Sequence, residues 1–335
     1  MADQIDRVTL SHGAGGTAMA RLIDEVFLDA YGDPAAARDD SAVVDCSGPL
    51  AFTTDSFVVD PLFFPGGDIG RLAVAGTVND LLTAAAQPLA ISASFIIEEG
   101  FAVADLRAIA RSAAETAEEC GVRIVTGDTK VVPRGLADGL YITTSGIGRV
   151  LRPGVSGASA RPGDVIILTG SIGDHGAAVM LARENLLETG AIASDAAPLT
   201  DIVANLLEAD CEIHGMRDPT RGGIGSALNE IARQSTVEIE IHESVVVVKP
   251  AVAAACEALG IDPFYVANEG KMLIVTAPAD ADRALDIVRA SRYGEEAAVV
   301  GEVRRGTAGR VIVRTSIGTS RILSPPSGEL LPRIC

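Results

Sequence analysis

The chain has 335 residues, a formal net charge of −18, 48% hydrophobic and 21% charged residues, and no tryptophan. So acidic a surface would repel phosphate backbones, which disfavours nucleic acid as a partner. No apolar run approaches the roughly 18 residues of a membrane span, and the first residues lack the basic and apolar blocks of a signal peptide. We therefore expect a cytoplasmic protein with no membrane contact, long enough for two domains.

The chain holds five cysteines, which are far apart and include no Cys-x-x-Cys pair. An odd number at such spacing supports neither a disulfide framework nor a zinc ribbon. We expect reduced thiols, with the four internal cysteines buried as small apolar side chains.

A loop of small residues at 9–16 precedes a stretch with apolar residues at helical spacing. The backbone N–H groups of Gly13, Gly15 and Gly16 could cradle a phosphate, although Gly-rich turns are common and the signal is weak alone. His12 in the same loop is as consistent with a local hydrogen bond as with a role in a site.

The first half of the chain then alternates strand-like and helical segments, several of which adjoin an acidic residue. We predict strands at 42–45, 50–54, 57–59, 90–97, 122–126 and 140–147, and helices at 68–86 and 104–119. Asp40 precedes the first strand, Asp55 follows the second, and Asp128 follows the strand at 122–126. Asp80 follows Asn79 in an apolar helix, where a carboxylate needs a partner or a metal.

Carboxylates that converge suit Mg²⁺ bridging a triphosphate, although each acid alone is as well explained as a solvated turn residue or a helix cap. As a set with Lys130 and the Gly-rich loop they favour a nucleotide. The sequence lacks Gly-x-x-x-x-Gly-Lys-Ser/Thr, so any ATP site is not of the P-loop type.

Turn residues near 152–162 indicate a boundary, after which the pattern is that of an α/β layer. We predict strands at 164–169, 237–241, 272–276, 297–303 and 310–314, and helices at 174–183, 199–207, 223–234, 251–259 and 281–290. A loop at 214–223 carries Asp218 and Arg221, and His175 stands beside a glycine. In a second loop Glu269 could be a base or a strand-end charge paired with Lys271.

The chain ends on a thiol, Cys335, after a spacer at 325–328 rich in proline and glycine. Residues 324–335 would reach about 40 Å when extended, so the tail could serve two sites. Three apolar residues near its end could anchor it, although ordinary terminal disorder explains it equally well. The chain's own carboxylate disfavours the thiolate, so activation must come from where the tail docks.

Together these motifs resemble the hydrogenase maturation factor HypE family, of the ATP-binding superfamily that includes aminoimidazole ribonucleotide synthetase and selenophosphate synthetase. The matching motifs are His12-Gly13-Ala14-Gly15-Gly16, Asp39-Asp40-Ser41-Ala42-Val43, Thr54-Asp55-Ser56, Val78-Asn79-Asp80, Thr126-Gly127-Asp128-Thr129-Lys130, Arg217-Asp218-Pro219-Thr220-Arg221-Gly222-Gly223, Asn268-Glu269-Gly270-Lys271 and Pro332-Arg333-Ile334-Cys335. The interior motifs identify the superfamily, and the ending selects the member.

The resemblance implies a two-domain PurM-like α/β (α+β) fold. An N-terminal ATP-binding domain at 1–152 would form a homodimer through a β-barrel-like interface, beside an α/β domain at 153–322 and a mobile tail at 323–335. ATP would lie at the domain junction. The implied ATP contacts are Gly13, Gly15, Gly16, Asp55, Asn79, Asp80, Thr129 and Lys130, and the implied Mg²⁺ ligands come from Asp40, Asp55, Asp80 and Asp128.

The implied reaction begins when a carbamoyltransferase, HypF, loads a carbamoyl group on Cys335. ATP-dependent dehydration would then give a thiocyanate, with Glu269 as base and Lys130 offsetting phosphoryl charge. The cyanide would pass to an iron-carrying HypC–HypD complex for [NiFe]-hydrogenase. The additional site candidates are His12, His175, Asp218 and Arg221.

Two other interpretations remain open. One keeps the fold but phosphorylates a free amide or selenide acceptor, as in the relatives. The other makes the protein a nucleotide-gated scaffold whose tail merely docks on partners.

Overall fold

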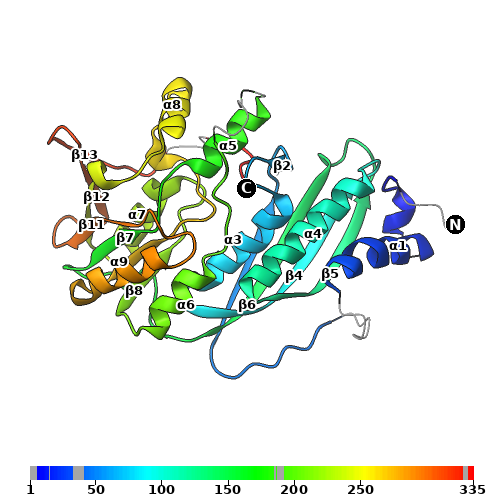
Figure 1. Ribbon diagram of the computed structural model, residues 1–335, viewed down its shortest axis with the longest axis horizontal. Helices are drawn as coiled ribbons and strands as arrows, with labels where there is room; N and C mark the ends of the chain where they lie inside the picture. The colour runs from blue at the N-terminus through cyan, green and yellow to red at the C-terminus, as the bar shows by residue number, and fades with distance from the viewer. Residues whose placement is uncertain (1–5, 15, 33–40, 185, 187–191, 327–330) are drawn as a thin grey trace.

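The computed structural model describes residues 6–14, 16–32, 41–184, 186, 192–326 and 331–335. Two β-sheets flanked by helices, one in each half of the chain, form its body (Figure 1). The first sheet ends at Val150 and the second begins at Val165, so the predicted division at residue 152 falls in the connection between them.

The first sheet has four strands in the order β1-β6-β4-β5. Its strands are β1 (Leu50–Phe57), β4 (Ala86–Glu98), β5 (Arg123–Val132) and β6 (Leu140–Val150). Strand β4 pairs antiparallel with β6 and parallel with β5. A short ladder of β2 (Phe63–Phe64) and β3 (Gly67–Asp68) follows β1. Strands β1 and β5 are therefore the two edges of the sheet.

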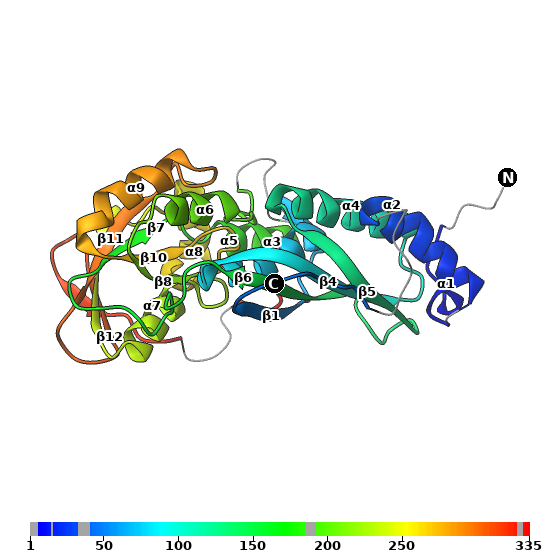
Figure 2. The same cartoon turned by 90° about the horizontal axis from the view of Figure 1, so that it is seen from below.

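Helices α3 (Ile69–Thr83) and α4 (Val103–Cys120) lie side by side on one face of this sheet (Figures 1 and 2). Asp68 caps α3, since its carboxylate accepts hydrogen bonds from the N–H groups of Gly70 and Arg71 at 2.7 and 3.1 Å. A Cβ on Gly70 would come within 2.3 Å of the Ile109 carbonyl oxygen, so glycine permits the close approach of the two helices. The outer end of the sheet carries a 3₁₀ turn (Leu10–Gly13), α1 (Thr17–Leu22), a π-helical turn (Ile23–Leu28) and α2 (Asp29–Tyr31).

No helix of the described residues covers the opposite face of the first sheet (Figure 2). Leu50, Phe52 and Ile96 are exposed on it, Phe52 by 70% of its surface. Thr53 and Asp55 alternate with these residues and point to the helical side, where the Thr53 hydroxyl donates to Asp80 at 2.7 Å. A sheet with one open, partly apolar face and two free edges suits association with a further sheet.

The second sheet has seven strands in the order β13-β12-β9-β11-β7-β10-β8. Its strands are β7 (Val165–Leu168), β8 (Ile213–Arg217), β9 (Glu238–His242), β10 (Leu273–Thr276), β11 (Ala298–Arg304), β12 (Arg310–Arg314) and β13 (Ser320–Ile322). Its helices are α5 (Asp174–Arg183), α6 (Thr200–Glu208), α7 (Gly223–Gln234), α8 (Pro250–Leu259) and α9 (Ala281–Ala290). Short 3₁₀ turns lie at Glu243–Val245, Pro263–Tyr265 and Pro278–Asp280.

The apolar core of the first half continues into the second. One cluster of buried side chains joins Leu72 and Ile109 of the first half to Ile167, Leu199 and Ile274 of the second. A second cluster lies around α7 and the other face of the second sheet. The two halves therefore share a packed junction.

A polar network crosses this junction. Arg71 of α3 pairs with Glu119 at 3.1 Å and donates to the Ala196 carbonyl at 2.7 Å and the Tyr293 hydroxyl at 3.2 Å. Asn79 donates to the carbonyl oxygens of Ala197 and Glu269 at 3.0 and 3.3 Å, and its Oδ1 accepts from the Leu199 N–H at 2.9 Å. These bonds fix the second half to α3.

Most predicted elements are present, and α5, α7 and α9 have the predicted bounds. The α/β class and the two-domain arrangement are confirmed. Residues 42–45 form no strand, and 50–54 and 57–59 belong to the single strand β1 or its continuation. The predicted loop at 214–223 begins instead as strand β8, and β5 runs through Asp128 to Val132. Among the described residues, no helix is both long and apolar enough to cross a bilayer.

Candidate active site

The described end of the tail, residues 331–335, lies between the two halves of the chain, with hydrogen bonds to Val58 of the first half and Arg183 of the second (Figure 1). Leu331 and Ile334 are buried, and the Cys335 carbonyl oxygen accepts a hydrogen bond from the Val58 N–H at 3.1 Å. The structure thus shows a docked tail, whereas the tail's mobility stays a prediction. Residues 327–330 of the spacer lie outside the described residues.

The thiol of Cys335 is half-buried in this docked position. Burial, and then the nearby Glu269 carboxyl, raise the pKa of Cys335 to about 11, while Arg221 acts in the opposite direction. Nη2 of Arg221 lies 3.5 Å from the sulfur. The docked thiol is therefore neutral at physiological pH, so the site does not itself activate it as a nucleophile.

Glu269 is buried next to this thiol, and its Oε1 has no hydrogen-bond partner among the described residues. Burial raises the pKa of Glu269 well above its usual range, and the nearby carboxyls of Asp218, Asp195 and Asp55 add to the shift. A carboxyl group that is buried, unpartnered and raised in pKa is a candidate for proton transfer. The predicted pairing of Glu269 with Lys271 is not found, because Lys271 pairs with Asp195 at 3.2 Å.

Three further carboxylates surround the same point. Burial and the charge of Asp80 raise the pKa of Asp218 to about 7. Burial followed by Asp80 also raises the pKa of Asp55. Burial raises the pKa of Asp80, against the hydrogen bond from Thr53 and the charge of Arg217. The structure therefore brings together Asp55, Asp80, Asp218, Arg221, Glu269 and Cys335.

The other predicted residues gather at the far edge of the first sheet. Asp128 and Lys130 lie on β5 and pair at 2.7 Å, an interaction that lowers the pKa of Asp128. Thr129 between them is buried. The Gly-rich loop packs on the same strand, since a Cβ on Gly13 would lie 2.8 Å from the Val131 nitrogen.

Within one chain these two groups do not meet. The register aligns Asp55 with Thr144, Ala93 and Gly127, so β1 and β5 stand three strand spacings apart, about 14 Å. In addition, the side chain of Asp128 lies on the open face of the sheet, whereas that of Asp55 points to the face covered by helices. The expected single site at the domain junction is therefore divided in the isolated chain, because strand order separates residues that follow similar motifs.

Two predicted residues make structural hydrogen bonds here. His12 is buried, and its Nδ1 accepts from the N–H of Thr9 at 2.9 Å within its own turn. Asn79 holds the domain junction as described above. The contact of Asn79 with ATP and a site role for His12 stay predictions, and Gly15 and Asp40 lie outside the described residues.

The described part of the chain contains no group of three or more His, Cys, Asp or Glu side chains arranged to hold a metal ion. Mg²⁺, however, commonly uses one or two protein carboxylates and completes its shell with phosphate oxygens and water. The raised pKa values of Asp55 and Asp80 mark a local excess of negative charge. This hard-oxygen pair fits such a shared ion.

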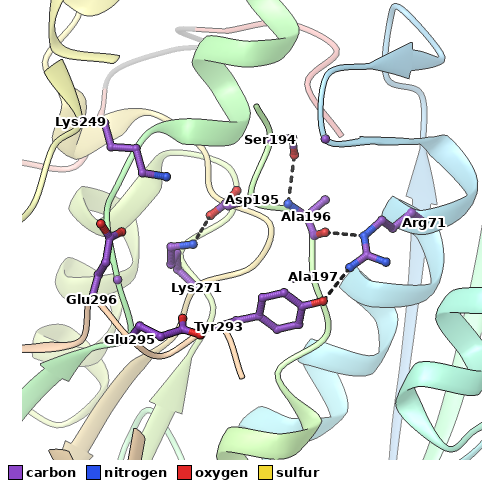
Figure 3. Close-up of a pocket in the computed structure, with 12 residues that line it drawn as sticks. Arg71, Ser194, Asp195, Ala196, Ala197, Lys249, Lys271, Tyr293, Glu295 and Glu296 are labelled. Atoms are coloured by element: carbon purple, nitrogen blue, oxygen red, sulfur yellow. Dashed lines mark hydrogen bonds and ion pairs between the residues drawn. The ribbon is translucent and has the colours of Figure 1, made fainter. Parts of the chain in front are cut away.

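A cavity of about 540 Å³ lies between the two halves and is lined by Arg71, Asp195, Lys271 and Tyr293 among others (Figure 3). Lys249, Glu295 and Glu296 line one side of the cavity, and Arg71 lies on the other (Figure 3). Cations and carboxylates both line it, so the lining favours neither sign of ligand. Its connection to the site is Asp195, whose Oδ1 accepts the Glu269 N–H at 3.0 Å.

Sequence reasoning missed Asp195 and Arg183. Burial by itself raises the pKa of Asp195, but the interactions with Lys271 and His175 outweigh this effect and lower the pKa overall. Arg183 donates to two carbonyl oxygens of the tail. Neither residue belongs to a motif, and only the apolar side chains of the tail indicated that a receptor existed.

Comparison with known proteins shows which family the chain resembles. The AIR synthase related protein N-terminal and C-terminal domains match residues 38–150 and 161–314. The carbamoyl dehydratase HypE of Bradyrhizobium diazoefficiens is 51% identical over 333 residues, covering 98% of this chain and 96% of that protein.

Two solved structures are also similar. The hydrogenase maturation protein HypE in complex with ATP has a TM-score of 0.95 at 45% identity, covering 98% of this chain and 99% of that one. A chain of a HypE–HypF complex has a TM-score of 0.80 at 48% identity, covering 91% and 99%. The predicted resemblance and PurM-like fold are thereby confirmed, and the chain belongs to the carbamoyl dehydratase HypE family of enzymes.

Proposed function

We propose that the chain dehydrates a carbamoyl group carried on its own Cys335 to a thiocyanate, which supplies cyanide for the iron of [NiFe]-hydrogenase. The observation that carries the proposal is the docked thiol beside Arg221 and a buried, unpartnered Glu269. A thiol with a pKa of about 11 is a poor nucleophile, but an S-carbamoyl group on it needs no thiolate in the second step.

The proposed chemistry removes one water from the amide. MgATP supplies the phosphoryl group that turns the amide oxygen into a leaving group. Formation of the O-phosphorylated thioimidate releases one N–H proton, and loss of phosphate with the second N–H proton leaves S–C≡N. Every atom of the lost water is accounted for, its oxygen leaving on phosphate.

Glu269 is our candidate for the group that accepts a proton from the nitrogen. Burial raises the pKa of Glu269, and a higher pKa makes its carboxylate a stronger base toward this proton. Arg221 would offset the negative charge that gathers beside the sulfur. The partly buried groove limits water, which would otherwise hydrolyse the activated group.

The carboxylates near Cys335 and the residues on β5 lie apart in one chain. They are consistent with a single ATP site if a second copy of the chain completes it. The open face with Leu50, Phe52 and Ile96 supports the predicted homodimer through first-domain strands. Pairing of the β5 edge of one copy with the β1 edge of the other would bring Asp128, Lys130 and the Gly-rich loop of one copy next to the strand that carries Asp55 of the other. A Cβ on Gly16 would meet no heavy atom within 4 Å, which leaves that part of the loop open to a phosphate.

The partners follow from the same chemistry. A HypF-type carbamoyltransferase would load the released tail, in line with the solved HypE–HypF complex, and a HypC–HypD complex would accept the cyanide. Both steps require Cys335 outside the groove. We propose a cytoplasmic setting for this exchange.

Intact-mass analysis tests the proposal. The chain is incubated with HypF, carbamoyl phosphate and ATP, and the loaded protein is then given MgATP. We expect an adduct on Cys335 that loses the mass of one water. In Glu269→Gln the adduct should form at the normal rate while dehydration falls by about 100-fold or more. A loaded adduct that MgATP leaves unchanged in the wild type contradicts the proposal.

The same experiment decides between the alternatives. Phosphorylation of a free amide or selenide predicts acceptor-dependent ATP turnover that survives Cys335→Ala. A scaffold predicts ATP binding with no change of mass after loading.

A further inference from the structure

The docked tail is held chiefly by its main chain. Three consecutive carbonyl oxygens, those of Pro332, Arg333 and Ile334, accept hydrogen bonds from side chains of the body. Arg183 donates from Nη1 to Pro332 at 2.9 Å and from Nη2 to Arg333 at 2.7 Å. The imidazole of His175 bonds Ile334 through Nε2 at 2.8 Å. The last peptide groups of the chain thus have fixed partners.

Both side chains come from helix α5, one from each end. His175 and Arg183 are eight positions apart, a rise of about 12 Å. The carbonyl groups of residues 332 and 334 are two residues apart, and Arg333 between them has a positive φ of 49°, so the tail bends there. Donors at the two ends of one helix therefore reach three successive carbonyl oxygens of a bent peptide.

The opposite side of the peptide pairs with the segment after β1. The N–H groups of Val58 and Asp60 donate to the carbonyl oxygens of Cys335 and Arg333 at 3.1 and 3.3 Å. Nε of Arg333 donates back to the Val58 carbonyl at 3.0 Å, and its Nη1 pairs with Asp138 at 2.5 Å. Residues 58–60 thus bind the main chain of the tail on this side as well.

The donors are preorganised by other contacts. Nδ1 of His175 lies 2.8 Å from the Ser194 hydroxyl, and the edge of the buried ring packs against Phe64. Because a carbonyl oxygen only accepts, Nε2 must carry the proton. Nε of Arg183 donates to the Asp60 carbonyl at 2.9 Å, which fixes the plane of the guanidinium.

We propose that Arg183 and His175 are positioning residues, and that with Val58, Asp60 and Asp138 they form a receptor for the last residues of this chain. We call these five residues the tail groove. The groove fixes the backbone of the final residue and so places the sulfur between Arg221 and Glu269. The inference rests on the proposed function only for its effect on turnover, because docking itself can be measured without catalysis.

The tail groove determines whether the thiol is available for loading by an external donor or for dehydration in the site. A docked Cys335 faces the site and is hidden from an external carbamoyl donor, whereas a released one is exposed. Weakening the groove therefore makes loading faster or leaves it unchanged and makes dehydration slower. A residue needed only for folding would impair both.

The rate at which iodoacetamide alkylates Cys335 at pH 8 measures release. Cys46→Ser forms the background, because Cys46 is the other cysteine that is not buried among the described residues. Release returns the thiol pKa from about 11 to about 8.5, which raises the thiolate fraction at pH 8 by up to about 200-fold. We expect Arg183→Ala and His175→Leu to accelerate alkylation at least about tenfold, since each removes hydrogen bonds with well-placed donors.

Three controls make the result specific. Arg111→Ala, at an exposed position of α4, should react like the background protein. His175→Gln keeps a donor near Nε2 and should restore part of the protection. Arg333→Ala alters only the tail and should also accelerate alkylation, even if changes in α5 impair folding.

An alkylation rate within twofold of the background protein in Arg183→Ala, His175→Leu and Arg333→Ala would overturn the inference. If docking weakens as expected but the wild type fails to dehydrate a loaded carbamoyl group, the tail groove stands and the proposed function fails. If both stand, the loaded Arg183→Ala protein should dehydrate at least about tenfold more slowly at an unchanged loading rate.

Discussion

Nη2 of Arg221 lies 3.5 Å from Sγ of Cys335, which brings a cation from the loop before α7 to the last residue of the chain. The same thiol stands near two carboxyl groups, Glu269 and Asp55, that raise its pKa. Arg221 is therefore the counter-charge for a site otherwise dominated by acids. Charge that develops on phosphate beside the sulfur would meet this guanidinium.

We expect Arg221→Met to slow dehydration by about 10- to 100-fold, because it removes the cation where negative charge gathers. Single-turnover mass analysis of the loaded protein measures this step. Loading should be unaffected, and Arg221→Lys should retain part of the rate because it keeps the charge. Equal dehydration rates in Arg221→Met and the wild type would exclude this role.

Glu269→Gln should stabilise the protein at alkaline pH. An acid whose pKa is higher in the folded state loses stability as pH rises from its unfolded pKa, about 4.3, to its folded one. Above the folded pKa the buried carboxylate is ionised and carries the full penalty, which glutamine lacks. Urea unfolding at pH 5 and pH 8 should show an advantage for Gln that is larger at pH 8. An advantage that is constant with pH would mean that Glu269 does not titrate in this window.

Mixed dimers should test whether a second copy completes the site. Lys130→Ala and Glu269→Gln proteins, each inactive as a homodimer, are mixed under conditions of subunit exchange. One of the two sites in a mixed dimer would contain both Lys130 and Glu269, so random mixing should restore about a quarter of the wild-type activity. Verified mixed dimers that remain inactive would refute a shared site.

Arg71→Met should lower the free energy of unfolding by about 2–3 kcal/mol, because it removes one charged partner of the largely buried Glu119 and leaves the Ala196 carbonyl without its donor. A double-mutant cycle with Glu119→Gln should show a clear coupling energy. The exposed i,i+4 pair of Arg21 and Glu25 offers a matched control, for which Arg21→Met should cost about 0.5 kcal/mol or less. Similar losses at both sites would argue against a structural role for the junction network.

The sequence predicted those elements whose signals are local. Helices α7 and α9 combine strong amphipathic periodicity with clear flanking residues, and their bounds were correct. Strand β8 was missed because its His214 and Gly215 resemble loop residues, which an edge strand tolerates. Residues 42–45 have a strand-like composition but no partner strand, and pairing is not visible in a single segment.

The site shows the same difference between local sequence signals and long-range pairing. Motifs identified Cys335, Glu269 and Arg221, which the fold brings together. The separation of Asp128 from Asp55 depends on strand order and register, which arise from pairing between distant segments. Arg183 could not be found by motif because it binds main-chain carbonyls, which any tail would present.

The amide of Asn79 has a consequence for how turnover can proceed. It ties α3 to the backbone of Glu269 and, through Leu199, to the start of α6. With the core continuous across the junction, the two halves cannot hinge apart without losing buried hydrogen bonds and apolar contacts. We therefore expect the two-domain body to stay rigid during turnover. The last few residues of the chain alone would exchange between the docked position in the site and a released position outside it.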